Sequence, residues 1–139
     1  DDIPDIYRIE LLCFNDPWDY KAMIEMMTLY LTSFYVAEAD GRIIGFSAGA
    51  IEDTDEEKYG HVCNIAVTPE MRGFGIGRLL LRKVERDFFL EGCRACSLEV
   101  RKSNTNAHGF YERLDYEDVL VFGGYYSDGE DAIVMMRWF

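Results

Sequence analysis

The stretch MRGFGIGRLLLRKVERDFFL, residues 71–90, places three glycines within five positions directly before an apolar stripe. Leu80, Val84 and Phe88 recur at every fourth residue, and this spacing predicts an amphipathic helix that ends near Gly92. The first turn of a helix leaves backbone N–H groups without intrahelical partners and carries the positive end of the helix dipole. Because glycine has no Cβ, a ligand can approach that backbone closely. The stretch therefore predicts a phosphate-binding loop at the start of this helix.

The spacing of the glycines excludes two common nucleotide loops. A P-loop ends in Gly-Lys-Ser/Thr, whereas Gly77 is followed by arginine and leucine. A dinucleotide fingerprint is G-x-G-x-x-G after the first strand of a βαβ unit, whereas Gly73, Gly75 and Gly77 alternate and follow a predicted meander of strands. The pattern that remains is R-x-x-G-x-G over residues 72–77, shortly after the strand NIAV.

The segments on both sides of this loop predict a mixed α/β domain. Asp40-Gly41 accepts the positive φ angles of a tight turn, so the β-rich runs around it predict a hairpin. The expected helices cover residues 3–14, 19–30, 76–91 and 103–114, and the expected strands cover residues 34–39, 42–53, 59–67, 95–100, 116–126 and 131–139. We expect residues 1–139 to form a single domain with a central, mostly antiparallel twisted sheet flanked by helices. The sequence opens without methionine and already at a predicted helix, so we also expect that a first strand is missing from it.

Charge and composition limit the kinds of partner. The formal net charge is -12, whereas nucleic-acid binding requires a basic face, so we expect no nucleic-acid partner. No apolar run reaches the ~18 residues of a membrane helix, so we expect no membrane partner and a cytoplasmic location. No dimerisation stripe is visible, and we expect a monomer.

The four cysteines do not indicate a metal or redox site. Cys93 and Cys96 form one C-x-x-C pair, but the chain has only two histidines, whereas a structural zinc site requires about four ligands. We therefore expect no metal. Cys13, Cys63 and Cys96 lie in apolar segments, where a free thiol acts as a small hydrophobe, and no cysteine is placed for a covalent acyl-enzyme.

Three separated segments, NIAVTPEMRGFGIGRLLL, SLEVRKSNTNAHGFYERLDY and GGYYSDGEDAIVM, resemble in order and spacing the RimI-type protein N-terminal acetyltransferases of the GNAT superfamily. The resemblance covers nearly the whole chain from Phe34 onward, and DPW at Trp18 resembles the group's first inter-helix loop. It implies the GNAT fold and direct transfer, in a ternary complex, of the acetyl group of acetyl-CoA to the α-amine of a protein or peptide N-terminus, such as that of a ribosomal protein. Two alternatives stay open: an acetyltransferase for lysine or a small-molecule amine, and a non-catalytic module that senses acyl-CoA.

Glu99 is the candidate general base. Strand alternation in CSLEV sends it to the face opposite Leu98 and Val100, and an unpartnered carboxylate on an interior strand is costly. It matches the glutamate of the RimI-type enzymes, and the alternative is an ion pair with Arg101 or another basic residue. An α-amine with a pKa of about 7.7–8.0 is ~10% neutral at pH 7, whereas lysine at about 10.4 is below ~0.1% neutral. An N-terminal acceptor therefore demands less of this base.

The pattern N-x-x-A-x-x-x-Y places Asn104 and Tyr111 seven residues apart, about two turns, on one side of a short helix. The resemblance implies that Asn104 binds the pantetheine arm and that the Tyr111 hydroxyl is the general acid beside the sulfur. The alternatives are that Asn104 is only an N-cap and that Tyr111 is a core residue.

The resemblance implies the other site residues as well. The acetyl-CoA-binding set is Ile65, Ala66, Val67, Arg72, Gly73, Phe74, Gly75, Ile76, Gly77, Asn104, Ala107 and Tyr111, with the backbone of residues 65–67 receiving the developing oxyanion. The acceptor-binding set is Trp18, Tyr20, Asn64, Tyr125 and Tyr126, for which aromatic packing is the alternative at the aromatic positions. His61 and His108 are not expected to be catalytic. Asp115 stands where the family has a glycine in the left-handed conformation.

Overall fold

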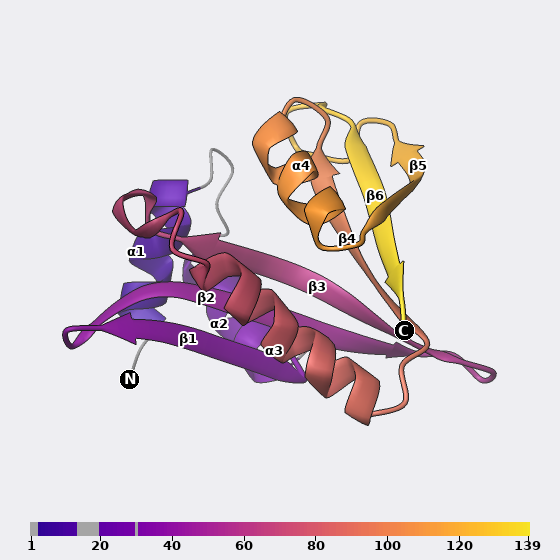
Figure 1. Ribbon diagram of the computed structural model, residues 1–139, viewed down its shortest axis with the longest axis horizontal. Helices are drawn as coiled ribbons and strands as arrows, with labels where there is room; N and C mark the ends of the chain where they lie inside the picture. The colour runs from indigo at the N-terminus through magenta and orange to yellow at the C-terminus, as the bar shows by residue number, and fades with distance from the viewer. Residues whose placement is uncertain (1–2, 14–19, 30) are drawn as a thin grey trace.

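A computed structural model describes residues 3–13, 20–29 and 31–139 (Figure 1). Its elements are α1 (Ile3–Cys13), α2 (Tyr20–Leu29), β1 (Ser33–Ala39), β2 (Arg42–Asp53), β3 (Lys58–Val67), the 3-10 helix η1 (Pro69–Met71), α3 (Ile76–Leu90), β4 (Ala95–Arg101), α4 (Thr105–Arg113), β5 (Glu117–Phe122) and β6 (Ala132–Trp138). The expected order of helices and strands is confirmed. Among the described helices, none combines the length and the apolar character of a membrane span.

The strands form one six-stranded sheet in the order β1-β2-β3-β4-β6-β5. Neighbouring strands are antiparallel except β3 and β4, which run parallel. The chain crosses between those two strands through α3, which lies across one face of the sheet, while α1 and α2 lie behind the other face (Figure 1). The expected mixed α/β architecture with a mostly antiparallel sheet is therefore confirmed.

Residues in the left-handed conformation set the ends of several elements. Asp40 and Gly41 have φ angles of 51° and 77°, as the tight turn between β1 and β2 requires. Asp115, at φ 74°, follows α4 in the same conformation, so this chain uses aspartate at a position that favours glycine.

The expected strand over residues 116–126 is too long. β5 ends at Phe122, because two glycines follow and Gly124 takes φ 64°. Tyr125 and Tyr126 therefore lie in the loop before β6. This loop, and not a strand, brings Tyr125 to Glu99 of β4.

α3 supplies the centre of the larger hydrophobic core. Its Val84 and Phe88 are fully buried in a cluster that includes residues of β3, β4, β6 and α4. A Cβ at Gly60 of β3 would overlap the Phe88 ring, so the helix can lie this close to the sheet only over a glycine. A second cluster packs Ile6 and Ile9 of α1 against β2 and β3.

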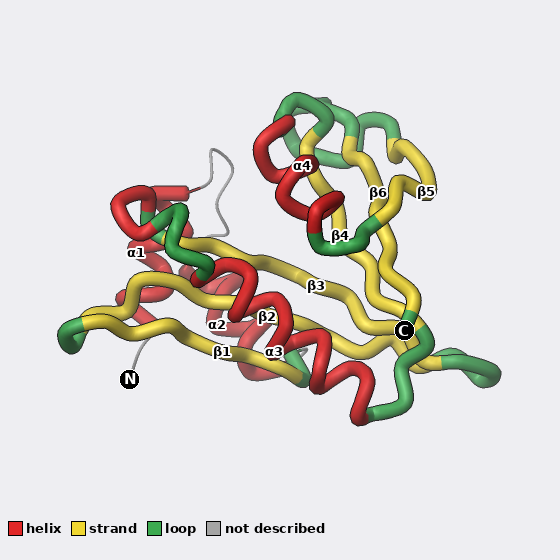
Figure 2. Tube along the Cα trace, in the orientation of Figure 1, coloured by secondary structure: helices red, strands yellow, loops and turns green. Residues whose placement is uncertain are grey.

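β3 and β4 stay together for only a short distance. Residues 59–61 of β3 pair with residues 95–97 of β4, and beyond them the two strands diverge (Figures 1 and 2). The diverging ends lead on the β3 side to the glycine loop and on the β4 side to α4. The gap between the diverging strands thus lies between the predicted phosphate-binding loop after β3 and the predicted catalytic residues of β4 and α4.

A β-bulge at Cys63 changes the direction of the β3 side chains. Val62 and Asn64 pair with neighbouring residues of β2, so Cys63 is the additional residue. Val62 belongs to the core on the α3 side, whereas Asn64 donates a hydrogen bond to Glu10 of α1. His61 precedes Val62 and by alternation takes the face opposite it. His61, Cys63 and Asn64 therefore share the α1 side of the sheet.

Candidate active site

Glu99 lies on β4 at the point where the strand leaves β3. Leu98 and Val100 are buried on the core side, and the Glu99 side chain, 19% exposed, takes the other face as expected. Its oxygens lie 2.8 Å and 3.0 Å from His61 Nε2, and the Tyr125 hydroxyl donates to Oε1 at 3.2 Å. Arg101 pairs with Asp128 and Glu130, and the basic residue that pairs with Glu99 is His61.

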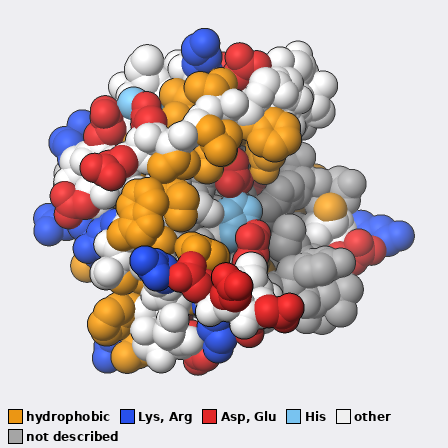
Figure 3. Space-filling view, turned by 90° about the vertical axis from the view of Figure 1, so that its right-hand side faces the viewer, with side chains coloured by type: hydrophobic (Ala, Val, Ile, Leu, Met, Phe, Trp, Pro, Cys, Tyr) orange, Lys and Arg blue, Asp and Glu red, His pale blue; other side chains and the backbone are white. Residues whose placement is uncertain are grey.

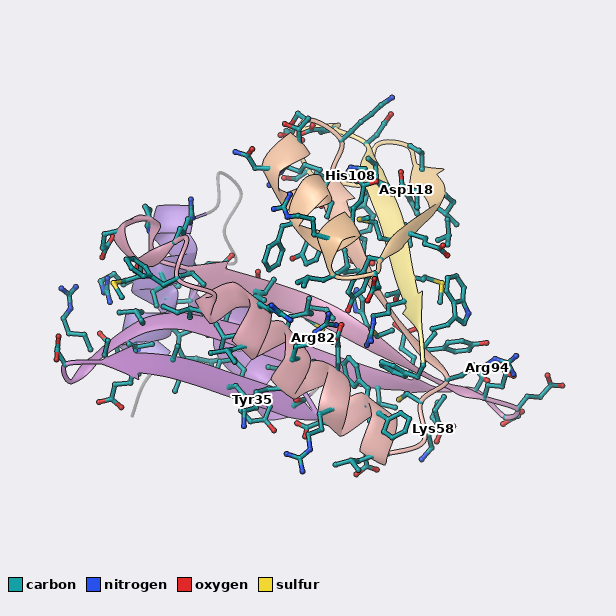
Figure 4. All side chains as sticks on the ribbon, in the orientation of Figure 1. Tyr35, Lys58, Arg82, Arg94, His108 and Asp118 are labelled. Carbon is teal, nitrogen blue, oxygen red and sulfur yellow. The ribbon has the colours of Figure 1, made fainter. Side chains whose placement is uncertain are left out.

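His61 is a site residue that the sequence prediction missed. Hydrogen bonding to Cys63 and to Glu99 raises the pKa of His61 to about 10, against the lowering effect of burial. The contact follows from the register of the sheet, because His61 pairs with Ser97 and alternation puts Glu99, two residues further along β4, on the same face as Ser97. His108, in contrast, joins α4 to β5 through Asp118 at 2.7 Å, and the two side chains point toward each other in Figure 4.

Tyr111 is a core residue by its surroundings. It is 8% exposed, and its ring makes edge contacts with the rings of Phe110 and Tyr116. Burial, and to a smaller degree Tyr126, raises the pKa of Tyr111. No hydrogen bond joins Tyr111 to Glu99 in the part of the chain that the structure describes. Tyr125 and Tyr126, with ring centroids 5.0 Å apart, each interact with one of these two residues: Tyr125 donates to Glu99, and Tyr126 contributes to the raised pKa of Tyr111.

Asn104 is the N-cap of α4. Its Oδ1 accepts a hydrogen bond from the Ala107 backbone N–H at 3.1 Å, so the capping role is confirmed. A role for Asn104 and Ala107 in binding pantetheine stays a prediction. The cap fixes the start of the helix that carries Tyr111.

The glycine loop has open space where a phosphate ligand would approach. Gly75 is the N-cap of α3 at φ 79°, and Gly73 has φ 88°. A Cβ built on either glycine meets no heavy atom within 4 Å, so the backbone conformation and not local packing requires glycine there. Gly77 differs, because its Cβ would lie 3.3 Å from the Phe110 ring of α4.

The other predicted cofactor residues surround this loop. Arg72 Nε donates to the Val67 carbonyl at 3.1 Å and so closes the loop against the end of β3. Ala66 packs with α1, and Ile65 packs on the α3 side, so a ligand between the strands meets chiefly their backbone. Phe74 is 71% exposed between the first two glycines, and Ile76 begins α3.

The predicted acceptor residues lie on the α1 side of the sheet and in the loop before β6. Asn64 Nδ2 donates to the buried Glu10 at 2.6 Å, and Tyr20 makes an edge contact with Tyr7. Tyr126 lies beneath the Arg101 guanidinium, 4.0 Å from its ring centroid. Trp18 lies outside the described residues. In Figure 3, histidine and acidic side chains lie in the recessed middle of this end of the molecule, bordered by hydrophobic side chains.

The described residues contain no cluster of three or more His, Cys, Asp or Glu side chains that could hold a metal ion. The polar groups that converge are a carboxylate, an imidazole and a phenol, and the bare N-terminus of α3 follows β3, the strand that carries the imidazole. Such a set suits proton transfer next to an anionic ligand.

Comparison with known proteins agrees with this geometry. Residues 3–116 match the family described as Acetyltransferase (GNAT) family. An uncharacterized N-acetyltransferase of Methanocaldococcus jannaschii is 38% identical, over 98% of this chain and 85% of that protein, and an N-alpha-acetyltransferase of Saccharolobus solfataricus is 35% identical, over 99% and 87%. The crystal structure of the ribosomal-protein-S18-alanine N-acetyltransferase from Escherichia coli has a TM-score of 0.84 and 28% identity, covering 99% of this chain and 87% of that chain. The chain belongs to the acetyltransferase (GNAT) family.

Proposed function

We propose that residues 1–139 act as a single-domain enzyme that transfers the acetyl group of acetyl-CoA to the α-amine of a protein or peptide N-terminus. The observation that carries the proposal is Glu99, held by His61 and Tyr125 where β3 and β4 diverge. The names of the relatives from Saccharolobus solfataricus and Escherichia coli support an N-terminal acceptor.

The residues around the glycine loop fit acetyl-CoA. Backbone amides of residues 73–77 at the α3 N-terminus are suited to its diphosphate, since two of the glycines leave open space there. Arg72, Phe74 and the backbone of residues 65–67 would line the path toward Glu99, with Asn104 and Ala107 on the α4 side. When bound, acetyl-CoA supplies an acetyl thioester as the electrophile.

Glu99 accepts a proton from the attacking amine. With its pKa at about 10, His61 is protonated at neutral pH and is therefore no proton acceptor itself. It orients the Glu99 carboxylate through two contacts and leaves the proton-accepting role to that group. Tyr125 donates to one of the same oxygens, so an incoming amine competes with Tyr125 for it.

Tyr111 serves as a hydrogen-bond donor to the departing sulfur. Its raised pKa keeps the hydroxyl protonated throughout the pH range of the reaction. The same shift disfavours the tyrosinate, so we assign it a hydrogen bond that stabilises the leaving group, with full proton transfer as the smaller contribution.

Tyr20, Asn64, Tyr125 and Tyr126, together with Trp18, form the proposed acceptor-binding set. Tyr125 and Tyr126 are supported by their place beside Glu99 and Arg101. We also propose that the enzyme works as a cytoplasmic monomer without nucleic-acid or membrane partners, in keeping with its net charge of -12. Light scattering of the purified protein tests the monomer.

One competition experiment separates the acceptor classes. A mixed pool of N-terminal peptides, lysine peptides and small amines is incubated with acetyl-CoA and the protein, and products are identified by mass spectrometry. We expect acetylation of peptide α-amines ahead of lysine and small amines. Preferential acetylation of a small amine or of lysine would overturn the N-terminal assignment. Binding of CoA with no acetylated product would instead indicate an acyl-CoA sensor.

A further inference from the structure

Arg101 is a charged residue to which the proposed reaction assigns no role. It is the last residue of β4, two positions after Glu99 and on the same face of the strand. In the antiparallel pair of β4 and β6 it lies opposite Ala132, the first residue of β6. The segment before Ala132 is the β5–β6 loop, residues 123–131. The register of the sheet therefore places the end of this loop beside Arg101.

Two carboxylates and an aromatic ring of the β5–β6 loop contact the Arg101 guanidinium. Its Nη1 donates to Asp128 at 2.8 Å and to Glu130 at 2.9 Å. The centroid of the Tyr126 ring lies 4.0 Å from Cζ, within the range of a cation–π contact. A guanidinium can meet carboxylates at its edge and a ring on its face at the same time, because it is planar. These contacts leave the Arg101 side chain only 18% exposed.

Other hydrogen bonds give the β5–β6 loop its shape. Asp131 Oδ1 accepts from the Gly124 backbone N–H at 3.0 Å, close to where the loop begins. The Gly129 N–H donates to the Tyr126 carbonyl at 2.9 Å, which closes a turn in the middle of the loop. Both bonds lie within the loop. The contacts of Arg101, in contrast, attach that turn to the strand that carries the proposed general base.

The attachment reaches Glu99 through the two tyrosines of the loop. The rings of Tyr126 and Tyr125 are in edge contact, with centroids 5.0 Å apart, and the Tyr125 hydroxyl donates to Glu99 Oε1 at 3.2 Å. Two glycines precede this pair and give the backbone freedom there. Because that backbone is permissive, side-chain contacts must hold the tyrosines in place. Arg101 supplies one of them through Tyr126.

We propose that Arg101 is a positioning residue, which holds the β5–β6 loop against β4 and so keeps Tyr125 and Tyr126 in the arrangement that binds the acceptor peptide. This role rests on the proposed function, in which the two tyrosines bind the acceptor. Arg101 acts through the loop and not by its charge on Glu99, because its charge is met by two loop carboxylates and Glu99 has His61 as its basic partner.

The first test measures hydrogen exchange in the loop, which requires no activity. Wild type, Arg101→Ala, Arg101→Lys and Arg94→Ala are compared by mass spectrometry of peptides that cover residues 123–131. Arg94→Ala is the matched control, because Arg94 precedes β4 at its other end and pairs with Glu57 at 2.6 Å. We expect the loop amides to exchange at least about tenfold faster in Arg101→Ala, with no change in peptides from α3 or in Arg94→Ala. Loop exchange equal to that of wild type would overturn the proposal.

The second test separates acceptor binding from chemistry. In Arg101→Ala, KM for the acceptor peptide should rise at least about tenfold, while kcat stays within about threefold and CoA affinity by calorimetry within about twofold. Arg101→Lys should recover only part of the loss, since an ammonium group keeps the charge but lacks the planar face. A fall in kcat at unchanged KM, or full recovery with lysine, would show that Arg101 acts by its charge.

The two tests also distinguish failure of this inference from failure of the proposed function. Wild type that acetylates no peptide overturns the proposed function and the acceptor-binding half of the inference, while loop exchange still decides whether Arg101 holds the loop. Wild type that acetylates peptides with the same KM as Arg101→Ala overturns the inference alone. Should Arg101→Ala not fold, both measurements on Arg101→Lys decide, with increases of about threefold expected in loop exchange and in KM.

Discussion

Glu85 and Glu99 each have more than one polar partner, and they differ in what holds them. The Glu85 side chain of α3 is 4% exposed and contacts Arg82 at 2.7 Å and Arg137 at 3.5 Å. Its other oxygen accepts from the Tyr116 hydroxyl at 2.6 Å. Glu99 is 19% exposed and contacts an imidazole and a half-exposed tyrosine. Figure 4 shows Arg82 on α3, between the helix and the body of the sheet.

The difference lies in the partners' chemistry and in their attachment. Guanidinium groups stay charged at every accessible pH, and those around Glu85 come from packed elements, so that carboxylate is a fixed charge in a structural network. The partners of Glu99 can change protonation or position, because one is a histidine and the other lies in a loop after two glycines. Because its hydrogen-bond donors can move away, the Glu99 carboxylate can accept a proton from a substrate.

The largest expected effect comes from Glu99→Gln. The amide keeps the shape and a hydrogen bond but cannot accept a proton, so kcat for peptide acetylation should fall ~10²- to 10⁴-fold. The midpoint of thermal unfolding should fall by only a few degrees, as in His61→Gln, because the same contact is weakened, and CoA should still bind. Stopped-time assays measure kcat, and calorimetry measures thermal unfolding and CoA binding. Retained turnover in Glu99→Gln would remove Glu99 from the mechanism.

Glu85→Ala should show the opposite profile. It leaves two arginines and a buried phenol without their acceptor, so the free energy of unfolding should fall by about 3–5 kcal/mol. Acetyl transfer per folded molecule should be preserved. Urea unfolding together with activity at low temperature separates the two quantities, and Glu85→Gln provides a milder variant that still accepts from Tyr116. An unfolding free energy equal to that of wild type would contradict the proposal that this network stabilises the fold.

Gly75→Ala extends the comparison to the cofactor loop, with Gly41→Ala as its matched control. Both glycines have positive φ, 79° and 77°, and open space at the Cβ position, so both substitutions should cost about 1 kcal/mol of stability. Only Gly75→Ala should also weaken CoA binding, by about tenfold. Equal effects of both variants on the CoA dissociation constant would argue against the loop as the diphosphate site.

The smallest expected effect is the pH dependence of the His61 contribution. Its folded-state pKa of about 10 lies above the usual 6.5, so the stabilisation is fully present below pH 6.5 and is lost as pH rises through about 10. We expect wild type to melt ~3 °C above His61→Gln at pH 6, with the difference disappearing near pH 10. Scanning calorimetry at both pH values measures it. A difference that grows with pH would show the assigned protonation state to be wrong.

The parts of the site that depend on local patterns were predictable from sequence. The α3 glycine loop, the Asn104 cap and the outward direction of Glu99 follow from spacing and alternation over a few residues. His61 was not found, because its contact with Glu99 depends on the parallel register of two strands 38 positions apart. Cys63 acquired a polar neighbour through a bulge, which apolar sequence context does not encode.

Two further features of the structure differ from the sequence prediction or were missed by it. The strand expected through Tyr126 stops at Phe122, because backbone freedom at the two glycines overrides the β propensity of the tyrosines. Glu85 was not singled out, since its partners come from three separate parts of the chain and only Arg82 lies on the same helix. Composition and periodicity thus predicted the architecture, while the partners of each buried charge required the three-dimensional arrangement.

β3 and β4 are paired at only three residues, so the two halves of the sheet are joined over a short stretch. Acetyl-CoA bound between the diverging strands, as we propose, would contact both of them. Occupancy then adds to the cohesion of the whole fold, by about 2.7 kcal/mol at a hundredfold excess of ligand over its dissociation constant. The thermal stability of this protein should therefore rise with the concentration of acetyl-CoA.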